Sequence, residues 1–226
     1  MLILGIDTAT SIGSVALFET ESRIPVGELS VSLFAAHSEK LIPYIDFLLE
    51  ESSRDYRDID IVAVSIGPGS FTGLRVGLST AKGLAFSLGK KPIVAVDSLM
   101  ARAFSPSKLT DRAAAFIDAK RDEVFAGIFE MEPESGIPSS IMEPRIVTFD
   151  KFVEECFSHN AFSITVDVVS NDYIDRLSKS GFRLSTSYNA LSLCELSYNI
   201  YTKIGASDIN TLSPKYLRDF KPGTPR

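Results

Sequence analysis

One sequence pattern occurs twice in this chain, 111 positions apart, and limits the folds that it can adopt. Ile6-Asp7, at the end of an apolar run, corresponds to Ile117-Asp118 when the numbering is shifted by 118 minus 7. The same shift aligns Phe18-Glu19 with Phe129-Glu130. An internal duplication of one β-rich α/β unit explains this pattern, and chance identity over a short stretch is the alternative. Two stacked units would leave a cleft between them, with Asp7 at its wall.

The order of the expected elements indicates the class of the repeated unit. Apolar, β-branched runs predict strands and one-sided apolar periodicity predicts helices, which gives β-β-β-α-β-α-β-α for the first half. The expected strands are residues 2–6, 13–18, 26–32, 59–66 and 92–96, with helices starting at Ser38, after Gly73 and at Ser98 as a candidate N-cap. Three hairpin-linked strands followed by alternating helices and strands suit a ribonuclease-H-like layer. We therefore predict an α/β protein with two tandem ribonuclease-H-like lobes.

The expected domains are residues 1–104, an N-terminal lobe with a glycine-rich loop and dimerisation helices, and residues 105–226, a reduced C-terminal lobe. In the second half, Thr148 is expected to cap a helix that reaches Cys156, and Leu191–Ile204 predicts a late helix. Three prolines in Glu132–Pro144 favour a loop there.

Composition excludes several classes of function. The chain carries a net charge of −6, so its overall charge does not favour nucleic-acid binding. The one basic cluster is the tail, a weak footprint for a tRNA-binding module: Lys215, Arg218, Lys221 and Arg226. Two cysteines, Cys156 and Cys194, provide neither a disulfide framework nor a spaced metal site. Without a signal peptide or an apolar stretch of about 18 residues, a soluble cytoplasmic protein is expected.

The strongest local signal is the glycine-rich loop Gly67–Gly73, between an expected strand and an expected helix. Glycines allow close backbone approach and a helix N-terminus attracts anions, so this loop could hold a phosphate. A tight turn that needs positive φ angles explains the same residues equally well. Asp7 and Thr8 could hold a metal-bound phosphate, or satisfy backbone N–H groups in a turn. The candidate vestigial phosphate-binding residues are Asp7, Thr8, Gly67, Gly69, Ser70, Thr72 and Gly73.

Catalytic chemistry has little support in the sequence. His37 and His159 are the two histidines, and no HExxH or GxSxG motif occurs. Asp118, the counterpart of Asp7, could likewise hold a ligand or satisfy a turn. The alternating charges of Asp118–Glu123 favour a solvated hairpin tip. The second half carries no glycine cluster for a second phosphate loop, which disfavours an autonomous kinase or ATPase. We expect no catalytic residue and no metal site.

Two helices of the first half look like interaction surfaces. Residues 41–49 contain seven apolar side chains, more than a one-sided surface helix needs. In the next helix, small residues recur every four positions: Gly73, Gly77, Ala81 and Ala85. This stripe allows another helix to approach closely, and packing on the protein's own sheet is the alternative.

Several segments resemble the TsaB family. They form five groups along the chain: Leu4–Thr10 with Ser14–Leu17, His37–Pro43, Gly67–Gly77 with Ala81–Ala85, Asp118–Phe125 and Pro214–Arg218. Gly67–Gly77 is the most specific of them, and residues 132–213 contribute little. TsaB is the non-catalytic, actin-like subunit of the bacterial machinery that makes threonylcarbamoyladenosine on tRNA, so the resemblance implies an actin-like (ASKHA-type) fold.

The resemblance also implies partners. The family pairs with the catalytic subunit TsaD through first-lobe helices, the pair recruits the ATPase TsaE, and self-association uses similar helices. Carried over by motif, the interface residues are Leu41, Tyr44, Ile45, Leu48, Gly73, Gly77 and Ala81. Contact with tRNA is expected indirectly, through the complex. No cofactor is expected in the isolated chain, and ATP or ADP with magnesium is expected only at a subunit junction. The alternative function is an autonomous ATP-dependent small-molecule kinase or ATPase that uses Asp7, Thr8 and Gly67–Gly73.

Overall fold

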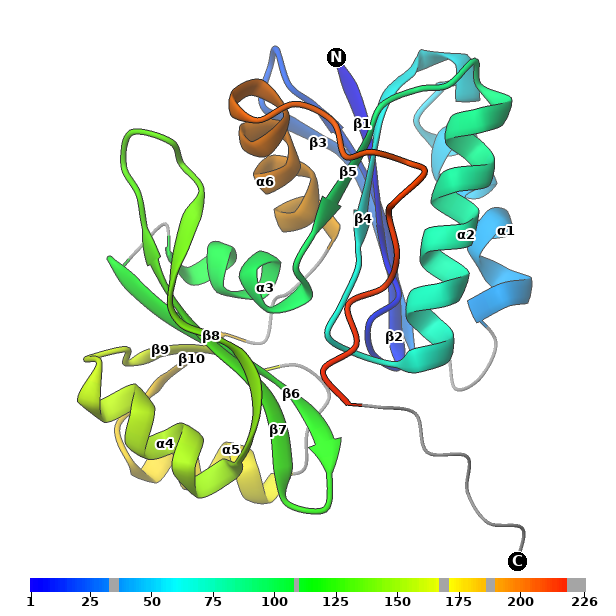
Figure 1. The fold of residues 1–226 in the computed structure, drawn as a ribbon. Helices are drawn as coiled ribbons and strands as arrows, with labels where there is room; N and C mark the ends of the chain where they lie inside the picture. Colours follow the sequence, from blue (N-terminus) through cyan, green and yellow to red (C-terminus); the bar gives the residue numbers. More distant parts are fainter. Residues whose placement is uncertain (33–36, 108–109, 167–170, 186–189, 219–226) are drawn as a thin grey trace, which may run out of the picture.

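Two five-stranded sheets of identical topology form the protein (Figure 1). The computed structural model describes residues 1–32, 37–107, 110–166, 171–185 and 190–218. The first sheet has the order β3-β2-β1-β4-β5, with β1 Leu2–Asp7, β2 Ile12–Glu19, β3 Ile24–Ser32, β4 Ile59–Ser65 and β5 Ile93–Val96. The second has the order β8-β7-β6-β9-β10, with β6 Arg112–Lys120, β7 Glu123–Met131, β8 Pro138–Thr148, β9 Ser163–Val166 and β10 Arg183–Ser185.

Helices occupy equivalent places in the two halves, as an internal duplication predicts. In each half the first three strands pair antiparallel and the last two add in parallel. One helix follows each of the last three strands: α1 His37–Glu51, α2 Phe71–Ser87 and α3 Ser98–Ser107, then α4 Phe149–Ser158, α5 Asn171–Lys179 and α6 Ala190–Lys203. A short 3-10 helix, Tyr56–Asp58, precedes β4. The predicted α/β class with two ribonuclease-H-like lobes is confirmed.

Each sheet is covered by helices on both faces, and this follows from the alternation of side chains along its central strand. Leu2, Leu4 and Ile6 of β1 pack with the residues of α1 and α2, while Ile3 packs on the opposite face with α6. Because successive residues of a strand point to opposite faces, a strand covered on both sides must be apolar throughout. All six residues of β1 are buried.

The third helix of each half packs on the sheet of the other half. α3 contacts β6, β7 and β9 of the second sheet, and α6 contacts β1, β2 and β5 of the first (Figure 1). A Cβ added at Gly5 of β1 would lie 2.6 Å from Cys194 Sγ of α6, so this glycine allows the close approach. In sequence, α6 falls within the expected second lobe, residues 105–226. In the structure it packs in the core of the first sheet.

Local signals fix several helix ends. Ser70 caps α2 by accepting the Gly73 N–H, and Thr148 caps α4 as predicted by accepting the Lys151 N–H. At α3 the prediction of Ser98 as the N-cap is wrong. The Asp97 carboxylate accepts the N–H groups of Leu99 and Met100, while the Ser98 hydroxyl accepts the Gly67 N–H.

The loop predicted for Glu132–Pro144 is right for residues 132–137 and wrong beyond them, because β8 begins at Pro138 and pairs with β7. Pro138 stands at the first position of the strand, and Pro144 falls between the paired residues Met142 and Arg145, where the register shifts. These are positions at which a strand tolerates proline. Among the described residues, no helix is long and apolar enough to cross a membrane.

Candidate functional site

The carboxylate of Asp7, at the end of β1, is held in a buried ion pair. Its Oδ2 lies 3.0 Å from Nη2 of Arg102 in α3, and Arg102 is fully buried. Its Oδ1 accepts the Ala9 N–H at 2.9 Å and the Ser65 hydroxyl. Both oxygens are therefore used by the protein itself. The prediction that Asp7 stands at the wall of the cleft is wrong, since only 1% of its surface is exposed.

Thr8 and the start of α2 are in direct contact. The Thr8 hydroxyl donates to the Gly73 carbonyl oxygen at 2.7 Å. A Cβ at Gly73 would lie 2.1 Å from the Thr8 carbonyl oxygen, and one at Gly77 would lie 2.3 Å from the Thr8 hydroxyl oxygen. Real Cβ atoms do not come this close. The absence of a side chain at both glycines therefore allows α2 to pack closely against Thr8.

The glycine-rich loop packs on the turn that follows β1. The Ser70 N–H donates to the Ala9 carbonyl oxygen at 2.6 Å, and a Cβ at Gly69 would lie 2.3 Å from that same oxygen. Gly67 has φ +115°, a conformation that favours glycine. The structure thus brings the predicted phosphate-site residues together, with Thr72 exposed, but it directs many of their polar groups at the protein itself.

Most residues predicted to contact a partner lie in the protein's own core. Leu41, Ile45, Leu48, Gly73, Gly77 and Ala81 are buried, and Tyr44 is half-buried. In this conformation their side chains contact the chain's own core, and their contact with a partner stays a prediction. The apolar and small-residue spacing in the sequence identified the inner faces of α1 and α2, which pack against the first sheet and Thr8.

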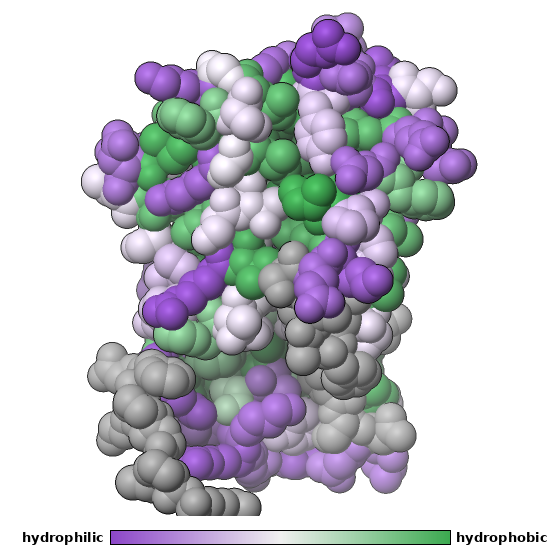
Figure 2. Space-filling view, turned by 90° about the vertical axis from the view of Figure 1, so that its right-hand side faces the viewer, coloured by the Kyte–Doolittle hydropathy of each residue, from purple (hydrophilic) through white to green (hydrophobic). Residues whose placement is uncertain are grey.

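The outer faces of the same two helices carry exposed hydrophobic side chains. On α1, Ile42 is 38% exposed and Phe47 is 51% exposed; on α2, Phe86 is 70% exposed. Figure 2 looks onto this side of the molecule, where hydrophobic surface emerges between hydrophilic side chains. We call Ile42, Phe47 and Phe86 the α1–α2 face. Ile42 and Phe47 are thus apolar residues of 41–49 that do not lie in the core.

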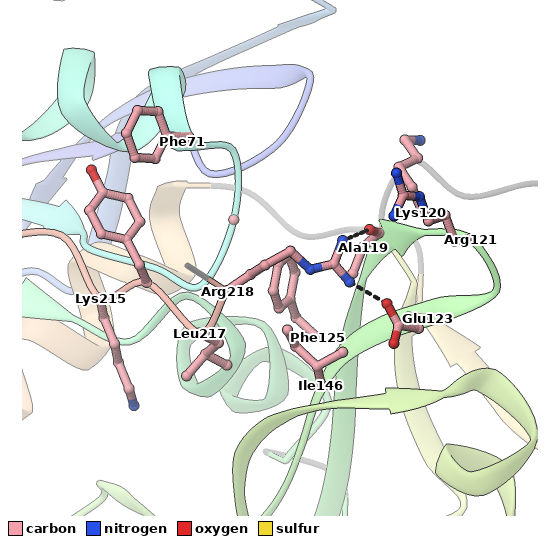
Figure 3. A pocket seen from close by; sticks show the side chains of 12 residues that line it. Phe71, Ala119, Lys120, Arg121, Glu123, Phe125, Ile146, Lys215, Leu217 and Arg218 are labelled. Carbon is pink, nitrogen blue, oxygen red and sulfur yellow. Dashed lines mark hydrogen bonds and ion pairs between the residues drawn. The ribbon is translucent and has the colours of Figure 1, made fainter. Parts of the chain in front are cut away.

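A cleft of about 930 Å³ lies between the lobes (Figure 3). Gly69 and Phe71 of the first lobe line it, together with five residues between Ala119 and Phe125 at the β6–β7 hairpin, Ile146, and Lys215–Arg218 of the C-terminal segment. A smaller adjoining hollow contains Asp118, the counterpart of Asp7. The alternating charges of residues 118–123 predicted the hairpin tip, but not that it faces a cleft.

The C-terminal segment is tied to both lobes along this cleft. The Lys215 N–H donates to the Ile66 carbonyl oxygen at 2.7 Å, and Lys215 Nζ lies 2.9 Å from Asp97 Oδ2. Arg218 donates to the Ala119 carbonyl oxygen at 3.0 Å and pairs with Glu123 across the cleft (Figure 3). Lys221 and Arg226, the rest of the predicted basic tail, lie outside the described residues.

Other reactive groups are dispersed or buried. Among residues 1–32, 37–107, 110–166, 171–185 and 190–218, no group of three or more His, Cys, Asp or Glu side chains could hold a metal ion. Burial raises the pKa of the Cys156 and Cys194 thiols, which disfavours the reactive thiolate.

Comparisons with known proteins agree on one family. The sequence model described as "TsaD: tRNA N6-adenosine threonylcarbamoyltransferase" matches residues 33–212. A tRNA threonylcarbamoyladenosine biosynthesis protein TsaB from Haemophilus influenzae is 27% identical over 97% of this chain and 94% of its own length. The TsaB protein of Escherichia coli is 34% identical over 65% of this chain and 64% of its own length.

A solved structure supports the same relationship. A Pseudomonas aeruginosa protein, described as similar to the peptidase YeaZ, superimposes with a TM-score of 0.79 at 25% identity. The match covers 96% of this chain and 99% of that protein. The predicted two-lobed, actin-like fold and the resemblance to TsaB proteins are both confirmed.

Proposed function

Because the chain belongs to the TsaD family and resembles TsaB proteins along nearly its whole length, we propose that it works in tRNA threonylcarbamoyladenosine biosynthesis as a subunit that positions a catalytic partner. The partner is a TsaD-type protein, and the pair recruits a TsaE-type ATPase. The reaction, transfer of a threonylcarbamoyl group to adenosine in tRNA, belongs to the complex.

The observation that carries this proposal is the α1–α2 face. Phe47 and Phe86 expose 51% and 70% of their surfaces on neighbouring helices. Exposed aromatic side chains of this size are costly in water, and aromatic anchors dominate binding energy at protein interfaces. A TsaD-type protein is related to this chain through the same family, so equivalent helices of the two proteins could pack against each other. A homodimer through this face would compete with that pairing.

The hydrogen bonds of Asp7 and Thr8 support a role without chemistry of its own. Asp7 uses both carboxylate oxygens within the protein, and the Thr8 hydroxyl donates to Gly73. An autonomous kinase or ATPase would need these groups for a nucleotide and its metal. Binding that ligand at this position would require breaking the buried pair of Asp7 with Arg102.

Reconstitution of tRNA modification tests the proposal. TsaD-type and TsaE-type proteins from the same genome, with ATP, a threonylcarbamoyl donor and unmodified tRNA, are assayed for threonylcarbamoyladenosine with and without this chain. We expect product only when the chain is present. Undiminished product without it would overturn the assignment.

Calorimetry with ATP and magnesium separates the alternative function. The isolated chain is expected to bind weakly or not at all. Tight binding that Asp7→Ala abolishes, in a variant that remains folded, would favour the kinase or ATPase instead.

A further inference from the structure

The cleft between the lobes concentrates positive charge in an acidic protein. The chain has a net charge of −6, yet four cations line the cleft beside a single carboxylate, that of Glu123: Lys120, Arg121, Lys215 and Arg218. The first two come from the β6–β7 hairpin and the last two from the C-terminal segment (Figure 3). A concave basic surface between low-dielectric walls attracts anions more strongly than the same charges spread over a flat surface.

Two of these cations are available to a ligand. The Lys120 side chain is 81% exposed, and its one ion-pair partner among the described residues is Asp118, at 2.8 Å. Arg121 is exposed and forms no ion pair with any described residue. Lys215 and Arg218 pair with Asp97 and Glu123, and both remain about 40% exposed. Surface pairs of this kind are worth little, so an incoming phosphate can compete for the cations.

The backbone that presents Lys120 and Arg121 is in an unusual conformation. Lys120, Arg121 and Asp122 have φ values of 68°, 61° and 59°, three successive left-handed residues without a glycine. Such conformations cost free energy and persist where the surrounding structure enforces them. Here the Asp118 carboxylate accepts the Lys120 N–H at 2.7 Å, and the Asp122 carbonyl oxygen accepts the Phe149 N–H at 3.1 Å. These bonds therefore hold the hairpin backbone that carries the two cations at the cleft.

Aromatic rings form the opposite wall. Phe71 and Tyr216 lie with their ring centroids 4.8 Å apart, Arg75 lies 3.8 Å above the Phe71 ring, and Tyr216 is 39% exposed. Phe125 lines the cleft from β7. Aromatic faces beside cations are the elements with which proteins bind single-stranded nucleic acid, because an unstacked base can lie on a ring while phosphates contact the cations.

We propose that this cleft binds a single-stranded segment of RNA, with bases against the Phe71–Tyr216 pair and phosphates at Lys120 and Arg121. The proposal rests on the proposed function, which makes tRNA the substrate of the complex, and adds a direct contact by this chain. A free nucleotide fits less well, since the glycine-rich loop donates its Ser70 N–H to Ala9 and leaves that donor unavailable to a terminal phosphate.

Binding of labelled RNA by the full-length chain tests the proposal. Fluorescence anisotropy is measured with a single-stranded RNA of about 12 nucleotides at low salt. We expect Lys120→Glu with Arg121→Glu to weaken binding by about tenfold or more and to reduce the salt dependence. Glu123→Gln should strengthen binding, because it removes the one carboxylate that lines the cleft. The matched control is Lys179→Glu with Lys203→Glu, which changes the net charge equally at exposed positions outside the cleft.

Competing ligands identify the chemistry. Double-stranded RNA of the same length should bind more weakly, and ATP at equal phosphate concentration should displace the probe poorly. Equal losses of RNA affinity in the cleft and control variants would mean that binding depends only on net charge. That result would overturn the proposal. Full displacement by ATP, or tighter binding of duplex RNA, would overturn it as well.

Reconstituted modification separates this inference from the proposed function. The Lys120→Glu, Arg121→Glu variant should still assemble with the TsaD-type subunit, while the KM for tRNA rises and the KM for ATP stays the same. An unchanged KM for tRNA would overturn the RNA contact and leave the subunit role intact. Dispensability of the whole chain would overturn the subunit role instead.

Discussion

Arg102 Nη2 of α3 lies 3.0 Å from Asp7 Oδ2 of β1, and neither side chain is more than 2% exposed. The same arginine donates through Nη1 to the Ser98 carbonyl oxygen at 2.9 Å, and its own carbonyl oxygen accepts the Thr165 hydroxyl at 2.8 Å. Asp7 belongs to the first sheet and Thr165 to the second. Arg102 therefore contacts residues of both sheets and joins the two lobes.

The first prediction concerns this ion pair. Arg102→Met leaves the Asp7 carboxylate buried without its cation, so we expect the free energy of unfolding to fall by about 3–5 kcal/mol. Arg54→Met is the control, because Arg54 pairs with Glu19 at the same kind of distance, 2.9 Å, with both side chains more than a third exposed. Arg54→Met should lower the free energy of unfolding by at most about 1 kcal/mol. Urea denaturation measures both, and equal losses would contradict a structural role for the buried pair.

A double variant sharpens this test. Asp7→Asn with Arg102→Met removes both charges, so it should cost less than the sum of the two single changes. Strict additivity would show that Asp7 and Arg102 do not stabilise each other.

The second prediction concerns the small-residue stripe of α2. A Cβ at Gly77 would lie 2.3 Å from the hydroxyl oxygen of Thr8, which is buried and hydrogen-bonded. Gly77→Ala should therefore lower the free energy of unfolding by about 1–3 kcal/mol through overpacking. At Gly83 of the same helix, an added Cβ would meet nothing within 4 Å, so Gly83→Ala should raise it by up to about 1 kcal/mol. Thermal denaturation compares them; a stable Gly77→Ala variant that fails to bind its partner would restore the stripe to the interface.

The third prediction concerns Cys194 in α6. Burial raises the pKa of its thiol, so at pH 8 the thiolate fraction is smaller than in a free cysteine. In a Cys156→Ala background, the native protein should react with a thiol reagent far more slowly than the urea-unfolded protein. The residual rate should fall when the fold is stabilised, because reaction requires α6 to leave the first sheet. Rapid labelling of the folded protein would contradict the packing of α6 on β1.

Much of the fold could be predicted from the sequence. The repeated strand–Asp pattern indicates where strands lie and which strands of the two halves correspond. The shift of 111 positions correctly related β1 to β6 and β2 to β7. The exchange of α3 and α6 between the lobes could not be predicted. Periodicity shows which residues share a helix face, but not which sheet that face covers.

The same limit explains the errors at the site. The apolar side chains of residues 41–49 indicated two faces of α1, yet the sequence could not tell Leu41 and Ile45, which are buried, from Ile42 and Phe47, which are exposed. A cleft between the lobes was predicted, but its cationic lining was missed because the cations come from segments about a hundred positions apart, around Arg121 and Arg218. Only the tertiary structure brings them together. Contact with a partner, a nucleotide or RNA remains a prediction.

The proposed partner interface is tested by the affinity of this chain for the TsaD-type subunit, measured by isothermal titration calorimetry. Phe47→Ser with Phe86→Ser removes the two most exposed aromatic side chains of the α1–α2 face, which lie outside the core and should leave stability nearly unchanged. Phe157→Ser, at a 45% exposed phenylalanine of α4, is the matched control. We predict a loss of about 100-fold or more in affinity for the double variant and none for the control. Wild-type affinity in the folded double variant would contradict the claim that this face holds the catalytic partner.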